Sequence, residues 1–218
     1  MHLILPLRPQ HKKEWKSLLS KVPAHIDFVE VWLDHFDQID LELKRVPESG
    51  MRFLGCCKSP KEGGRFHGSP KERLTILQMF LDGGGDFVDL DIQHNPSELI
   101  RHIPSEKLML SFHDFEGNLG EDDENLRSVF QKMQSFSPAM YKFAITTNDE
   151  KSLEIFLSWA RKIHSQGKII FSPMGKLGKR GRQILQKEKL TWGEFVTRDK
   201  NSRTASGQRI LKEIENSP

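Results

Sequence analysis

Short apolar runs of strand length recur along the chain, and most are followed by a longer, charged segment with apolar residues three and four positions apart. The eight runs cover residues 2–7, 28–33, 52–57, 87–92, 107–112, 139–145, 168–172 and, as the weakest pattern, 192–197. Helix candidates between them cover residues 11–22, 70–83, 121–135 and 149–166. This alternation predicts parallel strands joined by right-handed crossovers, and eight such units favour a closed (β/α)8 TIM barrel of the α/β class.

A doubly wound open sheet is the competing architecture. Such a sheet usually has a glycine-rich phosphate turn after its first strand, whereas residues 6–9 here read Pro-Leu-Arg-Pro. The sequence has no dinucleotide fingerprint, no clear repeat and no low-complexity linker. With 218 residues, of which 36% are hydrophobic and 29% charged, one domain over residues 1–218 is expected.

Charge and cysteine content restrict the partners and the compartment. The 33 basic and 30 acidic residues give a net charge of +3, too small to require a nucleic acid or an anionic membrane. The two cysteines, Cys56 and Cys57, are adjacent, a spacing that disfavours a bridge and favours a reducing compartment. The apolar start of the chain lacks a basic n-region and is interrupted by Pro6 and Arg8, so a cytoplasmic protein is expected.

In an α/β barrel the active site lies at the carboxyl ends of the strands, so polar residues at these positions are candidates for chemistry. Four of the predicted strands carry such residues at or near their ends: Glu30 and Asp34, Lys58 and Glu62, Asp89 and Asp91, and His113 and Asp114. Asp89, Asp91 and His94 are too few to indicate a metal, and acidic pairs in strands often orient lysines. No metal or organic cofactor is expected.

Lys142 is the most informative single residue, because it stands inside an otherwise apolar strand, residues 139–145. Desolvation disfavours an ammonium group and frees the amine to attack a carbonyl, as a Schiff-base nucleophile must. A lysine on a strand rim that extends its charge into water fits this segment equally well. If strands five and six are neighbours, however, His113 lies at the same mouth of the barrel and could move protons near neutral pH.

Two glycine-containing segments could approach a ligand, but each can also be explained as an ordinary loop. Lys61-Glu62-Gly63-Gly64 permits a sharp turn or a close approach to a ligand, but an ordinary loop explains it as well. Residues 175–182 lack the spacing of a phosphate-binding loop and are expected to form an exposed basic loop. In a barrel, that loop could instead direct an arginine at an anionic substrate.

Taken in order, these pieces resemble the type I 3-dehydroquinate dehydratases, α/β barrels that use a lysine imine. The matching blocks are residues 30–34 for Glu-x-Arg-x-Asp, 58–64 for Arg-x-x-x-Glu-Gly-Gly, 111–115 for Ser-x-His-Asp-Phe, 142–144 for Lys-Ile-Ala, 174–182 for Met-x-x-x-Gly-x-x-Ser-Arg and 204–208 for Ser-Ala-Pro-Gly-Gln. Each block is poorly specific alone, but their order and spacing extend across nearly the whole chain.

The resemblance implies a role for each matching residue. Lys142 would form the imine with the ketone of 3-dehydroquinate, His113 would be the general base and acid, and Glu62 would hold and orient His113. A second group would bind the substrate: Glu30 its ring hydroxyls, and Arg182, Gln208 and Thr204 its carboxylate, with Lys58 at the position of a binding arginine. Residues 197–208 are expected to form a mobile lid.

Several positions depart from the family pattern. Trp32 and Lys58 replace arginines and Gly181 replaces the serine beside Arg182, changes that bear on binding more than on the chemical step. The chain also begins at its first strand, without the leading hairpin that family members often have. Besides dehydration, two functions stay open: another Schiff-base lyase or aldolase acting on a related keto acid, and a degenerate barrel that binds a metabolite or a partner without turnover. The sequence does not give the oligomeric state, and a homodimer stays open.

Overall fold

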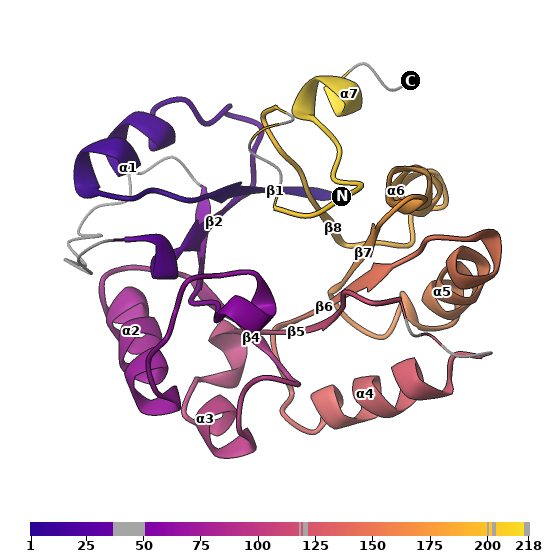
Figure 1. Ribbon diagram of the computed structural model, residues 1–218, viewed down its shortest axis with the longest axis horizontal. Coiled ribbons are helices and arrows are strands. Elements are labelled where there is room, and N and C mark those ends of the chain that lie inside the picture. The colour runs from indigo at the N-terminus through magenta and orange to yellow at the C-terminus, as the bar shows by residue number, and fades with distance from the viewer. Residues whose placement is uncertain (37–50, 118, 120–121, 200, 202–203, 216–218) are drawn as a thin grey trace.

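The computed structural model describes residues 1–36, 51–117, 119, 122–199, 201 and 204–215 of the chain. Eight parallel strands form a nearly closed barrel, with the helices arranged around its outside (Figure 1). The strands are β1 His2–Leu7, β2 Phe28–Trp32, β3 Arg52–Cys56, β4 Phe87–Asp91, β5 Leu108–Asp114, β6 Met140–Thr146, β7 Ile169–Met174 and β8 Gly193–Phe195. All eight predicted strands are present.

The strand order decides between the two architectures expected from the sequence. From β1 to β7 each strand pairs with the next one in the chain, and β8 pairs with β1. The remaining seam, between β7 and the segment entering β8, is bridged by hydrogen bonds from Trp192 N to Ile169 O at 2.9 Å and from Phe171 N to Thr191 Oγ1 at 3.2 Å. The sheet thus returns on itself, which confirms the (β/α)8 barrel and excludes the doubly wound sheet.

The described helices include the four that the periodicity predicts. They are α1 Lys12–Leu19, α2 Pro70–Asp82, α3 Ser97–Arg101, α4 Glu124–Gln134, α5 Glu150–Ile163, α6 Gly178–Lys187 and α7 Leu211–Glu215. Helix α2 begins as its sequence indicates, with Ser69 Oγ accepting from Glu72 N and Pro70 in the first turn. Within the described parts of the chain, every helix is too short or too polar to span a bilayer.

The expectation of an exposed basic loop at residues 175–182 is wrong from Gly178 onward, because helix α6 begins there. Two glycines in the first turn of this helix allow close packing: a Cβ on Gly178 would lie 2.8 Å from Pro173 O, and one on Gly181 2.8 Å from Pro173 Cγ. Two exposed basic residues of this segment are paired, Lys179 with Glu213 at 2.8 Å and Arg180 with Glu150. Helix α6 therefore packs directly on β7, and its residue Arg182 is buried.

Side chains alternate between the two faces of the barrel wall, as strand geometry requires. A large apolar core fills the space between the strands and the helices. A smaller apolar cluster fills the floor of the barrel interior, formed by Ile4, Phe28, Leu54, Met109, Met140, Ile170 and Phe195. Polar residues follow these floor residues on the same strands, so the interior becomes polar toward its carboxyl end.

Candidate active site

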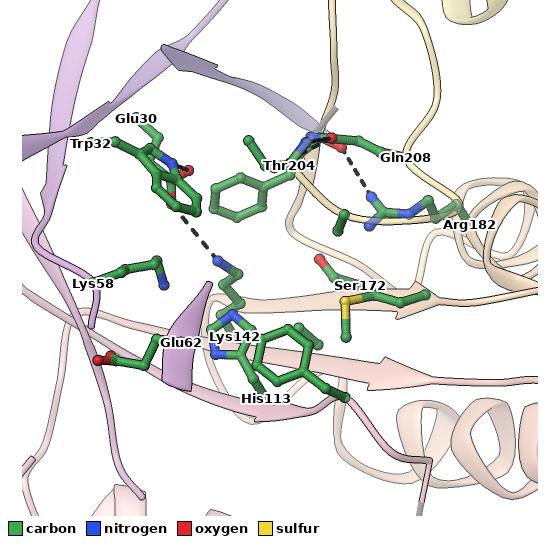
Figure 2. A pocket seen from close by; sticks show the side chains of 15 residues that line it. Glu30, Trp32, Lys58, Glu62, His113, Lys142, Ser172, Arg182, Thr204 and Gln208 are labelled. Atoms are coloured by element: carbon green, nitrogen blue, oxygen red, sulfur yellow. Dashed lines mark hydrogen bonds and ion pairs between the residues drawn. The ribbon is translucent and has the colours of Figure 1, made fainter. Parts of the chain in front are cut away.

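One cavity at the carboxyl end of the barrel is lined by all eight residues that the sequence predicts for the site (Figure 2). They are Glu30, Lys58, Glu62, His113, Lys142, Arg182, Thr204 and Gln208. The cavity holds about 470 Å³ of empty space, its open mouth included, which is the size range of small-molecule sites. Figure 2 shows Lys142 near the centre of this group, with His113 beside it.

Lys142 lies on β6 and projects into the barrel interior, where 6% of the residue is exposed. Its Nζ is 3.5 Å from Asp89 Oδ2, 3.8 Å from Glu30 Oε1 and 4.0 Å from the centre of the Phe195 ring. The rim position that the sequence left open is therefore ruled out by the geometry. The amine is enclosed by two carboxylates and an aromatic face at the bottom of the cavity.

Asp89 on β4 lies between two lysines, as expected for an acidic residue that orients cations. Its Oδ2 is 3.2 Å from Lys58 Nζ and 3.5 Å from Lys142 Nζ. Burial alone would raise the pKa of Asp89, but the two ammonium groups lower it well below its ordinary value. Burial alone would likewise lower the pKa of Lys58, and the Asp89 carboxylate instead raises it well above the ordinary value. Lys58 and Asp89 thus form a charged pair across a wide pH range.

His113 at the end of β5 is held by Asp91, two residues beyond Asp89. Its Nδ1 lies 2.7 Å from Asp91 Oδ2, and the other Asp91 oxygen accepts from Gln93 N at 2.8 Å. Burial and the nearby Lys58 charge lower the pKa of His113 to about 4, although the Asp91 contact opposes this shift. An ionised Asp91 requires the neutral ring to carry its proton on Nδ1, which leaves Nε2 as an unprotonated base.

The expectation that Glu62 holds and orients His113 needs correction. Glu62 Oε2 accepts from Ser59 N at 2.9 Å and from Ser59 Oγ at 2.6 Å, and it pairs with Arg73 at 3.0 Å. Figure 2 shows its carboxylate pointing away from the imidazole. The physical reason is local: Ser59 and Glu62 form a capping box, and Gly63 takes a φ of 82° that closes the turn. Glu62 lines the cavity, but its carboxylate is engaged by its own loop and by α2.

Trp32 lies in the wall of the cavity, at a position where the family that the sequence resembles has an arginine. Its Nε1 donates to Glu30 Oε2 at 2.7 Å, and the Arg8 guanidinium carbon lies 4.1 Å above its ring centre. Glu30 Oε1 is buried and makes no hydrogen bond with any described residue. The indole thus fixes one oxygen of Glu30 and leaves the other as a hydrogen-bond acceptor within the cavity, while Arg8 brings a positive charge behind the indole.

Arg182, Gln208 and Thr204 lie together on the opposite side of the cavity (Figure 2). Arg182 donates from Nε to Pro173 O at 3.1 Å and from Nη1 to Phe195 O at 3.0 Å, and burial lowers its pKa. Gln208 Oε1 accepts from Thr204 N at 2.9 Å. Arginine has five N–H donors, so the two main-chain contacts leave others for an anionic ligand.

A buried ion-pair network, formed by Arg182, Glu194 and Arg209, holds the Arg182 side of the cavity in place. Glu194 Oε1 lies 3.8 Å from Arg182 Nη1 and accepts from Arg209 Nε at 2.8 Å, and Arg209 also donates to Gln186 Oε1 at 2.6 Å. Removing one member of such a network leaves an unpaired buried charge, which is strongly destabilising. The network therefore fixes the direction in which Arg182 enters the cavity.

The arrangement combines an enclosed primary amine, a neutral imidazole with a free Nε2 and a guanidinium across the cavity. These groups suit imine formation on an anionic carbonyl compound followed by proton transfer. Searching the described residues for three or more His, Cys, Asp or Glu side chains placed to hold a metal ion gives no such group.

Sequence reasoning did not identify two contributors to this site, the partner of His113 and the cation stacked on Trp32. Both had a signal that could have been used. Asp91 is the last residue of β4, His113 is the last but one of β5, and Arg8 follows directly after β1, so each stands at the carboxyl edge where a barrel places its site.

Comparison with known proteins agrees with what the geometry of the site suggests. The sequence model of the family described as Type I 3-dehydroquinase matches residues 3–216. The 3-dehydroquinate dehydratase of Coxiella burnetii is 26% identical over 170 residues, covering 77% of this chain and 71% of that protein. The enzyme of the same name from Streptococcus thermophilus is 22% identical over 223 residues, covering 98% of this chain and 96% of that protein.

Solved structures show the same fold. Type I 3-dehydroquinate dehydratase from Clostridium difficile, carrying covalently modified comenic acid, superposes with a TM-score of 0.81 at 22% identity, covering 98% of this chain and 89% of that one. The 3-dehydroquinate dehydratase of Geobacillus kaustophilus gives 0.79 at 18% identity, covering 98% and 88%. Together with the match over residues 3–216, this shows that the chain belongs to the type I 3-dehydroquinase family.

Proposed function

We propose that this protein dehydrates 3-dehydroquinate to 3-dehydroshikimate through an imine on Lys142, with His113 as general base and acid. The observation that carries the proposal is the shared cavity: the enclosed Lys142 amine and the His113 imidazole line it together with Arg182. The reaction is that of a hydro-lyase in the shikimate pathway, which leads to the aromatic amino acids. It requires no metal or organic cofactor.

The chemical steps follow from the groups in the cavity. Lys142 Nζ attacks the ketone carbon, and loss of water gives a protonated imine, which withdraws electrons from the adjacent carbon. His113 Nε2 removes a proton from that carbon, and the electron pair forms an enamine. The enamine expels the β-hydroxyl group, which takes the proton back from His113 and leaves as water. Hydrolysis of the product imine restores the Lys142 amine and releases 3-dehydroshikimate.

Substrate binding is assigned to the two sides of the cavity. Arg182, with Gln208 and Thr204, would bind the carboxylate, since a guanidinium suits a carboxylate in bidentate geometry. Glu30 would accept from ring hydroxyls through Oε1, the oxygen that Trp32 leaves without a hydrogen bond. Lys58 lies on this same side as a charged neighbour of Asp89.

Borohydride trapping tests the central step. Incubation with 3-dehydroquinate, reduction and mass spectrometry are expected to find a covalent adduct on Lys142, and Lys142→Met is expected to abolish it. Absorbance of the conjugated product measures turnover in parallel. Absence of both adduct and turnover would defeat the proposal and favour a barrel that binds without catalysis. An adduct with a different keto acid, but none with 3-dehydroquinate, would favour another Schiff-base lyase.

The proposal extends to the setting of the enzyme. We place it in the cytoplasm, acting on a small molecule with no nucleic acid or membrane partner, as the near-neutral charge balance suggests. A homodimer is the oligomeric state we would test first, by light scattering of the purified protein. Residues 197–208 are proposed as the lid, of which residues 200 and 202–203 lie outside the described part of the chain.

A further inference from the structure

Ser172 on β7 has a buried hydroxyl that nothing assigned so far uses. Only 2% of the residue is exposed, and its Oγ has no hydrogen-bond partner among the described residues. The residue lines the cavity that contains Lys142 and Arg182. In Figure 2 the Ser172 Oγ points into the cavity, on the side between Lys142 and Arg182.

The strand register explains why this hydroxyl faces the ligand. Lys142 pairs with Ile170 and Ala144 with Ser172, so Ser172 stands one inward-facing position above the level of Lys142. Ile170 below it belongs to the apolar floor, whereas Phe171 between them packs in the outer core. Ala144 is small, which leaves space beside the serine hydroxyl. The hydroxyl is therefore directed toward the space above the reactive amine.

A buried hydroxyl without a protein partner is unfavourable, because burial from solvent is not offset by a hydrogen bond within the protein. Such groups in native structures call for an explanation, and a ligand that completes the hydrogen bond is one. The ligand atom that accepts this hydrogen bond must lie on the same side of the cavity as Arg182. Strand β7 leads directly into helix α6, which carries Arg182, and Pro173 O, one residue after Ser172, accepts from Arg182 Nε.

We infer that Ser172 is a specificity-determining residue that donates a hydrogen bond from Oγ to the carboxylate of the substrate, beside the Arg182 guanidinium. A carboxylate has about four lone-pair sites and can accept from both residues at once. This inference rests on the proposed function, since it takes the carboxylate of a cyclic keto acid as the group that Arg182 binds. It adds a neutral donor to the recognition of that group.

Steady-state kinetics of Ser172→Ala with 3-dehydroquinate test the inference. The KM is expected to rise roughly tenfold to a hundredfold, the range for hydrogen bonds to charged groups, with kcat within about threefold of wild type. Ser172→Thr retains a hydroxyl and is expected to recover most of the lost affinity. Ser158→Ala, on the outer helix α5, is the matched control for loss of a serine hydroxyl outside the barrel, and its KM is expected to equal that of wild type.

A substrate analogue identifies the oxygen that is bound. With a methyl group in place of the carboxylate, the ratio of dissociation constants between Ser172→Ala and wild type is expected to fall to about one. An unchanged ratio would assign Ser172 to another substrate oxygen and overturn the inference. So would a loss of kcat at unchanged KM.

Thermal unfolding distinguishes a binding role from a structural one. Because Ser172→Ala removes an unpartnered hydroxyl, its Tm is expected to equal or exceed that of wild type. A clear fall in Tm would show that the hydroxyl has a partner within the protein and would count against the inference. Wild-type turnover is measured in the same series, so failure of the proposed function, with no turnover at all, is distinguishable from failure of the Ser172 assignment.

Discussion

Asp89 and Asp91 are two residues apart on β4, and each orients a different group of the site. Both side chains face the barrel interior, because residues i and i+2 share a face of a strand. Asp89 lies at the level of the two lysines, and Asp91, one position nearer the mouth, contacts His113. A single strand thus positions both the amine and the base, and changing either carboxylate should affect a different step.

Asp91→Asn is expected to lower kcat by at least about a hundredfold, the scale of general acid–base catalysis, while imine formation persists. An asparagine can donate its amide N–H to Nδ1, which would favour the tautomer with the proton on Nε2 and remove the base from the cavity. Borohydride trapping measures the imine, and ¹⁵N NMR of the His113 ring measures the tautomer.

Glu62→Gln is the matched comparison for that experiment. The structure gives Glu62 contacts to Ser59 and Arg73, so this variant is expected to leave the His113 tautomer as in wild type. A tautomer that changes in Glu62→Gln but not in Asp91→Asn would restore the role that sequence reasoning gave to Glu62.

The pH dependence of kcat/KM should report the lowered pKa of His113. With a pKa of about 4, the ring is neutral and able to accept a proton throughout the range from about pH 5 to 8. The acid limb of kcat/KM assigned to His113 is therefore expected well below the value of about 6.5 of an unperturbed histidine. An NMR titration of the His113 ring measures the same pKa directly, and a midpoint near 6.5 would contradict the prediction.

At the scale of elements, the contact between α6 and β7 accounts for an unusual residue. Gly181 takes the place of a serine in the resembling family, and a Cβ there would lie 2.8 Å from Pro173 Cγ and 2.9 Å from Leu153 Cδ1. Contacts this short require the proline ring or the helix to move. The glycine is thus explained by packing against Pro173.

Gly181→Ser is expected to lower the free energy of unfolding by about 1–2 kcal/mol, measured by urea denaturation. Overpacking costs about 1–3 kcal/mol, and the better helix propensity of serine offsets about 0.5 kcal/mol of it. Adding Pro173→Ala should relieve part of the clash, so the double variant is expected to be more stable than the sum of the single effects predicts. Strict additivity would show that the two residues do not compete for the same space.

The segment at the end of the proposed lid is tied to the loop between β7 and α6. Ser206 Oγ accepts from Gly175 N at 2.9 Å, and Thr204 and Gln208 line the cavity. Ligand bound to Arg182 should strengthen these contacts, so trypsin cleavage after Arg203 is expected to slow severalfold in the presence of 3-dehydroshikimate. Cleavage after Lys189 in the same digest serves as the control. Equal rates at Arg203 with and without product would argue against closure.

The sequence predicted the elements better than their contacts. Short apolar runs identify the eight strands because each run is a local feature of the sequence. The partner of His113 depends instead on how β4 and β5 are staggered across the barrel, which local pattern does not encode. Helix α6 was missed because its first turn contains Gly178 and Gly181, and glycine is a poor helix former whose packing role appears only when β7 is in place.

At the scale of the whole molecule, the barrel encloses charged and titratable groups that the unfolded chain would expose to water. His113 and Asp91, Asp89 and Lys58, and the pair Glu194 and Arg209 are all largely removed from solvent. Stability must therefore depend on pH, with a sign set by which state binds more protons.

Acidification is expected to destabilise the fold in two successive windows. The folded pKa of His113 is about 4, below its unfolded value of about 6.5, so between these values the unfolded chain binds the extra proton and stability is lost as the pH falls. The full effect is on the order of 3 kcal/mol by linkage. Burial lowers the pKa of His35 in the same direction. The pKa of Asp89 is lowered too, so its contribution is present above its unfolded value of about 3.9 and is lost below it.

Urea denaturation at pH 7.5, 5.5 and 4.5 measures the first window, and His113→Asn separates the histidine from the rest of the molecule. The wild-type free energy of unfolding should fall across this series, whereas the variant should lose less of it, because asparagine does not titrate. His35→Asn, in the same series, isolates the smaller contribution of the other buried histidine. If wild type and His113→Asn lost stability equally, the pKa of His113 would not be lowered by folding. The folded barrel would then not keep this imidazole neutral, as the dehydration chemistry requires.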